Sequence, residues 1–341
     1  MAQAKSLKQI IEQLTEKFTP VVRNAFLAAI ADVSNTVVLN ELIKAIEANN
    51  IEKAFKVLGL SDAAMRPLTA ALESVFEQGG IAVGKTFPRV LNTPDFGKTR
   101  FLFDVRSTRA EQWLKEQSSR LIVEIQEDTR INVMNTLQKG LSEGANPRVT
   151  ALDIVGRVGA SGKREGGLIG LTSHQELWVR NARDDLSNLD ERYFTRLRRD
   201  KRFDGIVRKA IAEKRPLTKE TIDKLISRYK DSLLQLRGET IGRTETIQSL
   251  NRANFEAIRQ AKDIGALRGA TKEWDSSGDS RVRDSHRHMD GQSVEIEEPF
   301  VTPDGDKLMF PGDTSLGAPA KEIINCRCRF KLKMDWLQDI D

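Results

Sequence analysis

Two histidines and two cysteines near the carboxyl end of the chain have the residue types and spacing of a metal site. Positions 326–328 read Cys-Arg-Cys, and two of the three histidines are His286 and His288, followed by Asp290. In an extended strand, alternate residues share a face and lie about 6.6 Å apart, so two such thiolates can converge on one zinc ion. A structural zinc ion takes four ligands in a tetrahedral arrangement. One interpretation of the pattern is therefore a structural zinc site formed by Cys326 and Cys328 with His286 and either His288 or Asp290.

The same residues allow other interpretations. The two cysteines fit a buried strand face with a hydrogen-bonded histidine nearby, or a redox pair, although a disulfide across Cys-x-Cys is strained. A Cys–His catalytic pair needs a thiolate activated by an imidazole in an open cleft, and the sequence marks no third residue to orient the imidazole. A metal-dependent nuclease that uses His286 would draw on clustered carboxylates. Asp275, Asp279, Asp284 and Asp290 are available, but their Ser- and Asp-rich loop is typical of solvated side chains.

The cysteines begin a segment that alternates between apolar and basic residues. Positions 326–333 read C-R-C-R-F-K-L-K, which predicts a half-buried strand with both cysteines on its apolar face and Arg327, Arg329, Lys331 and Lys333 on the other. Lys272-Glu273-Trp274 predicts a second short strand. The carboxyl end is therefore expected to form a short antiparallel sheet.

The rest of the chain follows the helical period. Residues 51–58 predict a short helix ended by Gly59, and a further helix is expected to stop at Gly79-Gly80. Thr172 with Gln175 predicts a capping box. The most regular amphipathic pattern covers residues 218–261 and predicts one or two long helices. The fold class that we expect is mainly α, with a helical amino-terminal body and a small carboxyl-terminal α+β domain.

Composition is that of a soluble, charge-rich protein. Of 341 residues, 39% are hydrophobic and 30% are charged, and no apolar run approaches the roughly 18–20 residues that cross a bilayer. The first residues lack the apolar centre of a signal peptide. We expect no membrane anchor, and a protein that is kept in a cytoplasm or packed into a particle assembled there.

Charge is unevenly distributed along the chain. Residues 191–215 hold ten Lys or Arg against four Asp or Glu, whereas residues 271–341 hold fifteen acids against ten bases. Such runs are typical of solvated helix faces, and a basic run can also contact the phosphates of double-stranded DNA without regard to its sequence. The candidate DNA-binding residues are Arg196, Arg198, Arg199, Lys201 and Arg202.

Glycine content suggests how the chain is divided. Residues 156–170 contain six glycines in fifteen positions, which predicts a hinge or an exposed loop. The predicted organisation has four parts: a helical region at 1–155, the hinge at 156–170, a basic helical region at 171–236 and an α+β domain at 237–335.

An ordered set of short motifs in the last part of the chain resembles the phage head morphogenesis family, minor head proteins similar to protein F of phage Mu. The motif residues that carry the resemblance are Arg243, Glu245, Asp279, Arg283, His286, Asp290, Gly291, Asn325, Cys326 and Cys328. They lie within Gly242-Arg243-Thr244-Glu245-Thr246, the segments 279–286 and 289–292, and Asn325-Cys326-Arg327-Cys328. Each piece is short, and their order over about 95 residues is what makes the resemblance specific.

The resemblance implies a virion protein rather than an enzyme. It implies a few copies at or near the portal or on the inner capsid surface, associated with packaged DNA and with its ejection, after assembly in the host cytoplasm. It carries over no catalytic residue. The alternative is an enzyme delivered with the genome, a metal-dependent nuclease or a Cys–His hydrolase that uses His286 and Cys326 or Cys328.

Overall fold

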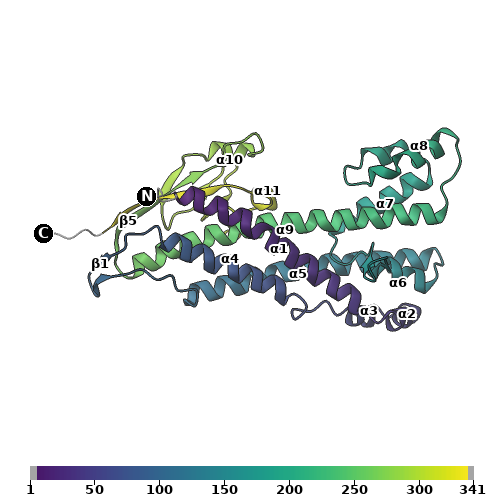
Figure 1. Cartoon of the computed structure of the whole chain (residues 1–341), viewed down its shortest axis with the longest axis horizontal. Coiled ribbons are helices and arrows are strands. Elements are labelled where there is room, and N and C mark those ends of the chain that lie inside the picture. Colours follow the sequence, from purple (N-terminus) through teal and green to yellow (C-terminus); the bar gives the residue numbers. More distant parts are fainter. Residues whose placement is uncertain (1–5, 337–341) are drawn as a thin grey trace. The chain divides into compact units, whose positions relative to one another are not determined.

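The helical period of the sequence gives a mainly α fold with small antiparallel sheets, as predicted (Figure 1). The structure is a computed structural model that describes residues 6–336, so residues 1–5 of the predicted helical region lie outside the described residues. Its α-helices are α1 (Leu7–Thr36), α2 (Leu39–Glu47), α3 (Ile51–Leu58), α4 (Arg66–Gly84), α5 (Thr108–Ser142), α6 (Pro147–Val155), α7 (Ser173–Ser187), α8 (Asp204–Ala212), α9 (Lys219–Asp263), α10 (Asp284–His288) and α11 (Ala320–Ile323). Two 3-10 helices, η1 (Glu191–Thr195) and η2 (Lys201–Phe203), precede α8.

The strands are short and pair in antiparallel fashion. They are β1 (Leu91–Thr93), β2 (Gly97–Thr99), β3 (Arg157–Val158), β4 (Arg164–Glu165), β5 (Leu267–Asp275), β6 (Ser293–Glu295), β7 (Phe300–Val301), β8 (Lys307–Leu308) and β9 (Arg329–Trp336). The largest sheet has the order β6-β5-β9, with Trp274 opposite Phe330. The glycine-rich segment 156–170 contains the β3–β4 hairpin.

Local side-chain chemistry sets several helix boundaries where the sequence predicts them. The Asn50 side chain accepts a hydrogen bond from the Lys53 amide at 2.8 Å and begins α3. Gly59 ends that helix with a φ of +64°, a conformation that costs glycine little. The capping box of Thr172 and Gln175 begins α7. These predictions are confirmed.

The predicted helix end at Gly79-Gly80 is wrong, because α4 continues through both glycines. A Cβ at Gly80 would lie 2.2 Å from the Phe103 ring, and one at Gly79 would lie 3.0 Å from the Leu250 side chain. The glycines therefore permit close packing in the interior of the helix. Sequence alone does not distinguish this role from termination.

The predicted strand at 326–333 starts later than expected. β9 begins at Arg329, and both cysteines lie in the loop before it. Arg329 was expected on the solvated face but is buried, since its guanidinium lies 2.7 Å from the Asp275 carboxylate and 3.3 Å from that of Glu12. Ion pairing thus buries a position that the alternating pattern assigns to solvent.

Two compact units make up the described chain, each from segments that are distant in sequence. The sheet unit contains residues 6–24, 68–118 and 239–336, and the helical unit contains residues 25–67 and 119–238. The boundaries drawn from the sequence at 155, 170 and 236 stay a prediction.

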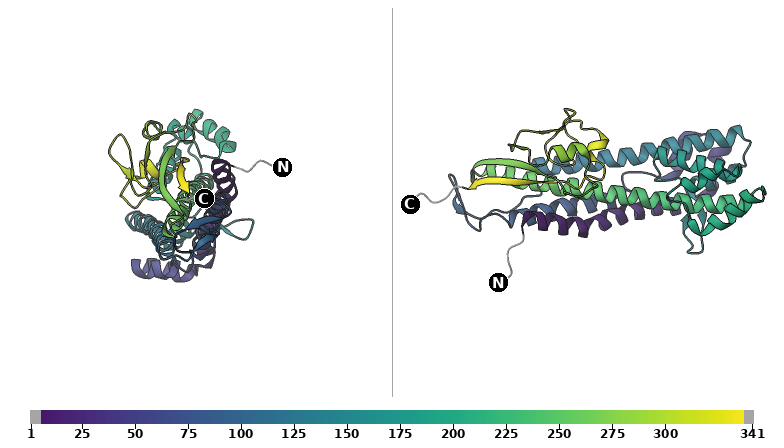
Figure 2. Two further views of the ribbon diagram at one scale, coloured as in Figure 1. Left: turned by 90° about the vertical axis from the view of Figure 1, so that its left-hand side faces the viewer. Right: turned by 90° about the horizontal axis from the view of Figure 1, so that it is seen from above.

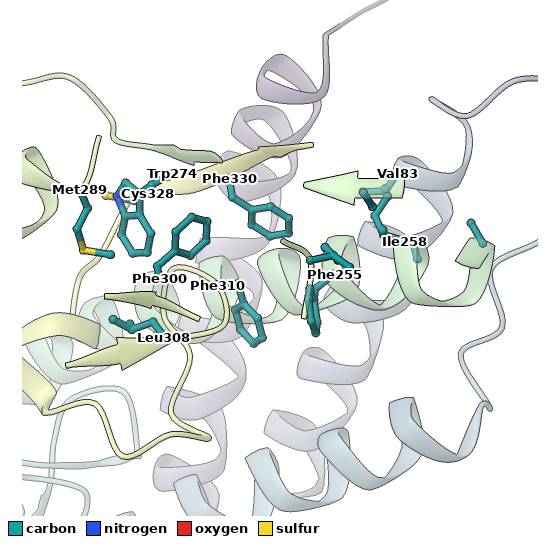
Figure 3. Close-up of a cluster of buried hydrophobic side chains, with 14 of the residues drawn as sticks. Val83, Phe255, Ile258, Trp274, Met289, Phe300, Leu308, Phe310, Cys328 and Phe330 are labelled. Atoms are coloured by element: carbon teal, nitrogen blue, oxygen red, sulfur yellow. The ribbon is translucent and has the colours of Figure 1, made fainter. Parts of the chain in front are cut away.

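The core of the sheet unit lies between the three-stranded sheet and the last turns of α9. Phe255 and Ile258 of α9 pack with Trp274 and Phe330 of the sheet, and Val83 of α4 joins the same cluster (Figure 3). In Figure 2, β5 and β9 run side by side over the carboxyl-terminal part of α9. This packing fixes the loop that carries the cysteines.

The helical unit has a separate apolar cluster. Leu186 of α7, Val207 of α8 and Leu225 of α9 are among its buried members, and α7 and α8 lie beside the amino-terminal half of α9 (Figure 1). Within the described residues, no single helix is long and apolar enough to cross a membrane, while α1 and α2 together, bent by 72°, meet that test of length and composition.

Candidate metal centre

His286, Cys326 and Cys328 come together in the sheet unit, although some forty residues separate the histidine from the cysteines. His286 lies on α10, and the two cysteines lie in the loop between α11 and β9. The Nδ1 atom of His286 is 3.5 Å from the Cys326 sulfur and 3.4 Å from the Cys328 sulfur. All three ligand atoms lie within 4.8 Å of one another, and all three residues are at most 3% exposed.

Glu322 of α11 holds the other side of the imidazole. Its Oε2 atom lies 2.9 Å from His286 Nε2, and both side chains are buried. Glu322 Oε2 also accepts a hydrogen bond from the Ser285 hydroxyl at 2.8 Å. A carboxylate on Nε2 favours the tautomer whose Nδ1 lone pair faces the sulfurs.

Arginine residues join the segments that carry these groups. Arg283, just before α10, donates to the carbonyl of Ile324 at 2.7 Å and to that of Lys321. Arg327, between the two cysteines, forms a two-pronged ion pair with Asp279, with one contact at 2.6 Å. This contact holds the pKa of the Asp279 carboxyl well below its usual range. These charged residues thus hold the segment before α10 against the segment that carries the cysteines.

Two polar residues of α9 fix the backbone on either side of the cysteines. Asn251 is fully buried and donates from its side chain to the carbonyls of Pro311 at 2.9 Å and Cys328 at 3.1 Å. The Asn325 amide, in a left-handed conformation with φ +57°, donates to the Thr244 hydroxyl at 3.0 Å. The cysteine loop is therefore anchored on the long helix.

The two thiols have unequal proton affinities. The hydrogen bond that joins them lowers the pKa of Cys328 and raises that of Cys326, since one sulfur donates and the other accepts. His286 lowers the pKa of Cys328 further, while burial raises the pKa of both thiols. Cys328 is therefore the sulfur that is more readily present as a thiolate.

His288 and Asp290 do not join the cluster. His288 is exposed, and its Nδ1 lies 2.8 Å from the carbonyl oxygen of Asp284 on its own helix. Asp290 is also exposed, and its Oδ1 accepts a hydrogen bond from the Ser276 amide at 2.7 Å, beside the turn at Gly291, whose φ is +81°. These two predicted ligands shape the loop around the cluster.

Glu322 is the member of this site that the sequence reasoning missed. It lies in a short helix 36 residues after His286, and neither spacing nor an alternating pattern connects the two positions. Only the tertiary structure brings α11 against α10.

The two charged motif residues of α9 both contact side chains of helices. Arg243 is exposed and lies 3.8 Å from Glu239 on its own helix. Glu245 is buried and accepts a hydrogen bond from the Gln117 side chain of α5 at 2.6 Å.

The five candidate DNA-binding residues differ in exposure. Arg196 and Arg199 are largely buried and pair with Asp185 and Asp204, respectively. Arg198 is half-buried, whereas the other two residues, Lys201 and Arg202, are exposed. Arg202 also lies 2.7 Å from Asp200 with 74% of its side chain exposed.

Comparison with known proteins yields one match. Residues 215–331, about a third of the chain, match the sequence model of the family described as "Phage Mu protein F like protein". No curated protein and no solved structure matches the chain significantly. The matched residues include α9 and the whole His–Cys–Cys cluster.

Proposed function

We propose that the protein is a minor head protein of a tailed phage, because residues 215–331 match the model of the phage Mu protein F like family. It acts in head morphogenesis, binds the portal or the inner capsid surface, and stays in the virion with the packaged DNA. The family match is the observation that carries the proposal. The protein is present in the host cytoplasm only during assembly, and it leaves the particle when the genome is ejected.

The contacts around the family motifs favour a binding role over catalysis. Arg283, Asp279 and Asn325 connect helices and loops, and all three residues of the cluster that they surround are buried. A rigid docking module needs such cross-connections, whereas a nucleophile needs an open cleft.

Particle composition tests the assembly role. Phage particles should contain this protein in a few copies relative to the major capsid protein, measured by quantitative mass spectrometry after density purification. Lysates that lack the protein should contain fewer DNA-filled heads by electron microscopy. Normal yields of filled, infectious heads without the protein, together with its recovery only outside particles, would contradict the proposal.

The basic segment before α9 supplies a DNA-contacting surface in this proposal. Its exposed cations are Arg192, Lys201, Arg202, Arg208, Lys209, Lys214 and Arg215. Each cation that neutralises a phosphate releases condensed counterions and contributes about 0.9 to the slope of log affinity against log salt. Arg196 and Arg199 are left out of this surface because their ion pairs bury them.

Charge neutralisation tests this surface. A variant with Lys201, Arg202 and Lys209 replaced by Gln should bind double-stranded DNA with a salt slope reduced by about 2–3. The matched control replaces Lys44, Lys53 and Lys56, which are exposed lysines of α2 and α3, and changes the net charge equally. Equal slopes for the two variants would remove the DNA contact and leave the assembly role standing.

One observation favours the enzyme alternative. Cys328, His286 and Glu322 form a thiol–imidazole–carboxylate chain of the kind that activates a nucleophile. We expect no esterase, peptidase or nuclease turnover that depends on Cys328, because the chain is buried. Turnover by the purified full-length protein that disappears in Cys328→Ala and survives in His288→Ala would establish the enzyme instead.

A further inference from the structure

The distances within the cysteine–histidine cluster match those between the ligands of a tetrahedral zinc ion. A sulfur about 2.3 Å and a nitrogen about 2.05 Å from the same tetrahedral metal lie about 3.6 Å apart. The two sulfur-to-Nδ1 distances are 3.4 and 3.5 Å. With all three donor atoms within 4.8 Å of one another, these distances suit a single ion.

The Glu322 carboxylate contacts His286 in the way that carboxylates contact histidine ligands of zinc. Histidine ligands of zinc almost always donate their remaining ring N–H to a carboxylate or carbonyl, which fixes the tautomer and raises the basicity of the ligand nitrogen. Here Nδ1 faces the sulfurs and Nε2 faces the Glu322 carboxylate at 2.9 Å. The alternative interpretation, in which the cysteines are buried core residues beside a hydrogen-bonded histidine, requires no such buried carboxylate.

Charge balance also suits a metal at this buried place. Zinc with two thiolates and a neutral imidazole has no net charge, so burying the complete centre avoids the large cost of an isolated ion. Two thiolates without a metal would leave charge uncompensated among the apolar neighbours Trp274 and Met289, which belong to the same core cluster.

We propose that His286 Nδ1, Cys326 Sγ and Cys328 Sγ bind a zinc ion. In the described part of the chain, no fourth histidine, cysteine or carboxylate atom joins these three within 4.8 Å. Cys326 also lines a cavity of about 360 Å³, together with Ser277, Asp279 and Arg327. A water molecule from this cavity completes the coordination. The ion fixes α10 to the cysteine loop, and this role is independent of the head function proposed above.

Metal content of the full-length protein tests the site directly. The protein purified under reducing conditions should contain about one zinc per chain by mass spectrometry of the metals. Cys326→Ser, Cys328→Ser and His286→Gln should each lower the content at least tenfold. The matched control is His288→Gln, two residues from His286 and outside the cluster, which should keep its zinc.

Cobalt substitution of the unmutated protein gives a reading that does not depend on the folding of variants. Cobalt should produce a sulfur-to-metal charge-transfer absorption and the visible bands of a tetrahedral site, and zinc should displace it stoichiometrically. Chelation should lower the melting temperature by several degrees, and added zinc should restore it. The proposal would be overturned if the purified protein contained no metal and had either two freely reactive thiols or a Cys326–Cys328 disulfide. Added zinc or cobalt would then change neither its absorption spectrum nor its melting temperature.

Discussion

At the scale of single residues, the sheet unit tolerates buried charge only where several groups surround it. Lys272 is fully buried on β5, and its ammonium donates to the carbonyls of Ile296 at 2.9 Å and Met309 at 2.6 Å. The rings of Phe255 and Phe300 lie 4.9 and 5.2 Å from it. Carbonyl dipoles and aromatic faces thus replace part of the hydration that this cation loses.

Lys272 should make the stability of the protein increase with pH in the alkaline range. Burial lowers the pKa of Lys272 from 10.5 to about 8, so between these values the unfolded chain binds the proton more strongly than the folded chain. Stability from this group therefore rises as pH increases from about 8 to about 10.5, by up to about 3 kcal/mol.

Comparison with Lys272→Met isolates this effect. Free energies of unfolding from urea titrations of both proteins should be measured between pH 7 and pH 11. The difference, wild type minus variant, should increase with pH across the stated window, since the variant lacks the titrating group. A difference that stays constant, or falls, would contradict the assignment.

Residue types were enough to predict part of the candidate site. The rest depends on how short helices pack, which the sequence does not show. The Cys-x-Cys pair and His286 have side chains that bind metals, so their convergence could be anticipated from the sequence. Choosing His286 over His288 depends on which face of α10 is buried, and five residues carry too little periodicity to decide that. Glu322 required knowing that α11 packs against α10.

At the scale of elements, close approach rather than helix propensity explains the glycines of α4. Replacing a glycine in a helix interior with alanine ordinarily stabilises the helix by about 1 kcal/mol. At Gly80 the new Cβ would lie 2.2–2.4 Å from ring atoms of Phe103, which packs against Phe76 with ring centroids 5.6 Å apart. The overlap should outweigh the gain in propensity.

Gly80→Ala should therefore destabilise the protein by about 1–3 kcal/mol in chemical denaturation. Gly205→Ala in α8 is the matched control, because its Cβ would meet nothing within 4 Å, and it should be neutral or stabilising. Adding Phe103→Leu to Gly80→Ala should recover part of the lost stability, because leucine lacks the ring atoms that the new Cβ would overlap. Equal effects of the two alanine substitutions would show that the Phe103 contact does not matter.

Features of helices and strands that depend on residues close in sequence were predictable, and those that depend on residues distant in sequence were not. The Thr172–Gln175 box and the left-handed Gly59 act within a few residues, so the sequence indicates them directly. The close packing at Gly80 within α4 and the burial of Arg329 in β9 depend on Phe103, Asp275 and Glu12, which are distant in sequence. A pattern of apolar residues contains no information about such partners.

At the scale of the whole molecule, the family segment depends on chain that precedes it. Glu256 of α9 is fully buried, and its carboxylate accepts from the Ser107 hydroxyl at 3.2 Å and pairs with Arg109 at 3.1 Å. Glu245 likewise relies on Gln117, and Val83 and Phe87 belong to the core that contains Phe255. These partners come from α4, α5 and the connection between them, which a linear domain boundary at 237 separates from the sheet.

Residues 215–341 alone should consequently fail to fold cooperatively, because they would expose the apolar face of α9 and leave Glu256 with Arg252 as its remaining cationic partner. Circular dichroism should show no sharp thermal transition, and a dye that binds apolar surface should fluoresce. Co-expression with residues 1–214 should restore a sharp transition, since the break falls in an exposed stretch before α9 and every packed segment is again present. A fragment that melts cooperatively by itself, within a few degrees of the intact chain, would instead show that the sheet and the last turns of α9 contain enough buried apolar surface to fold unaided.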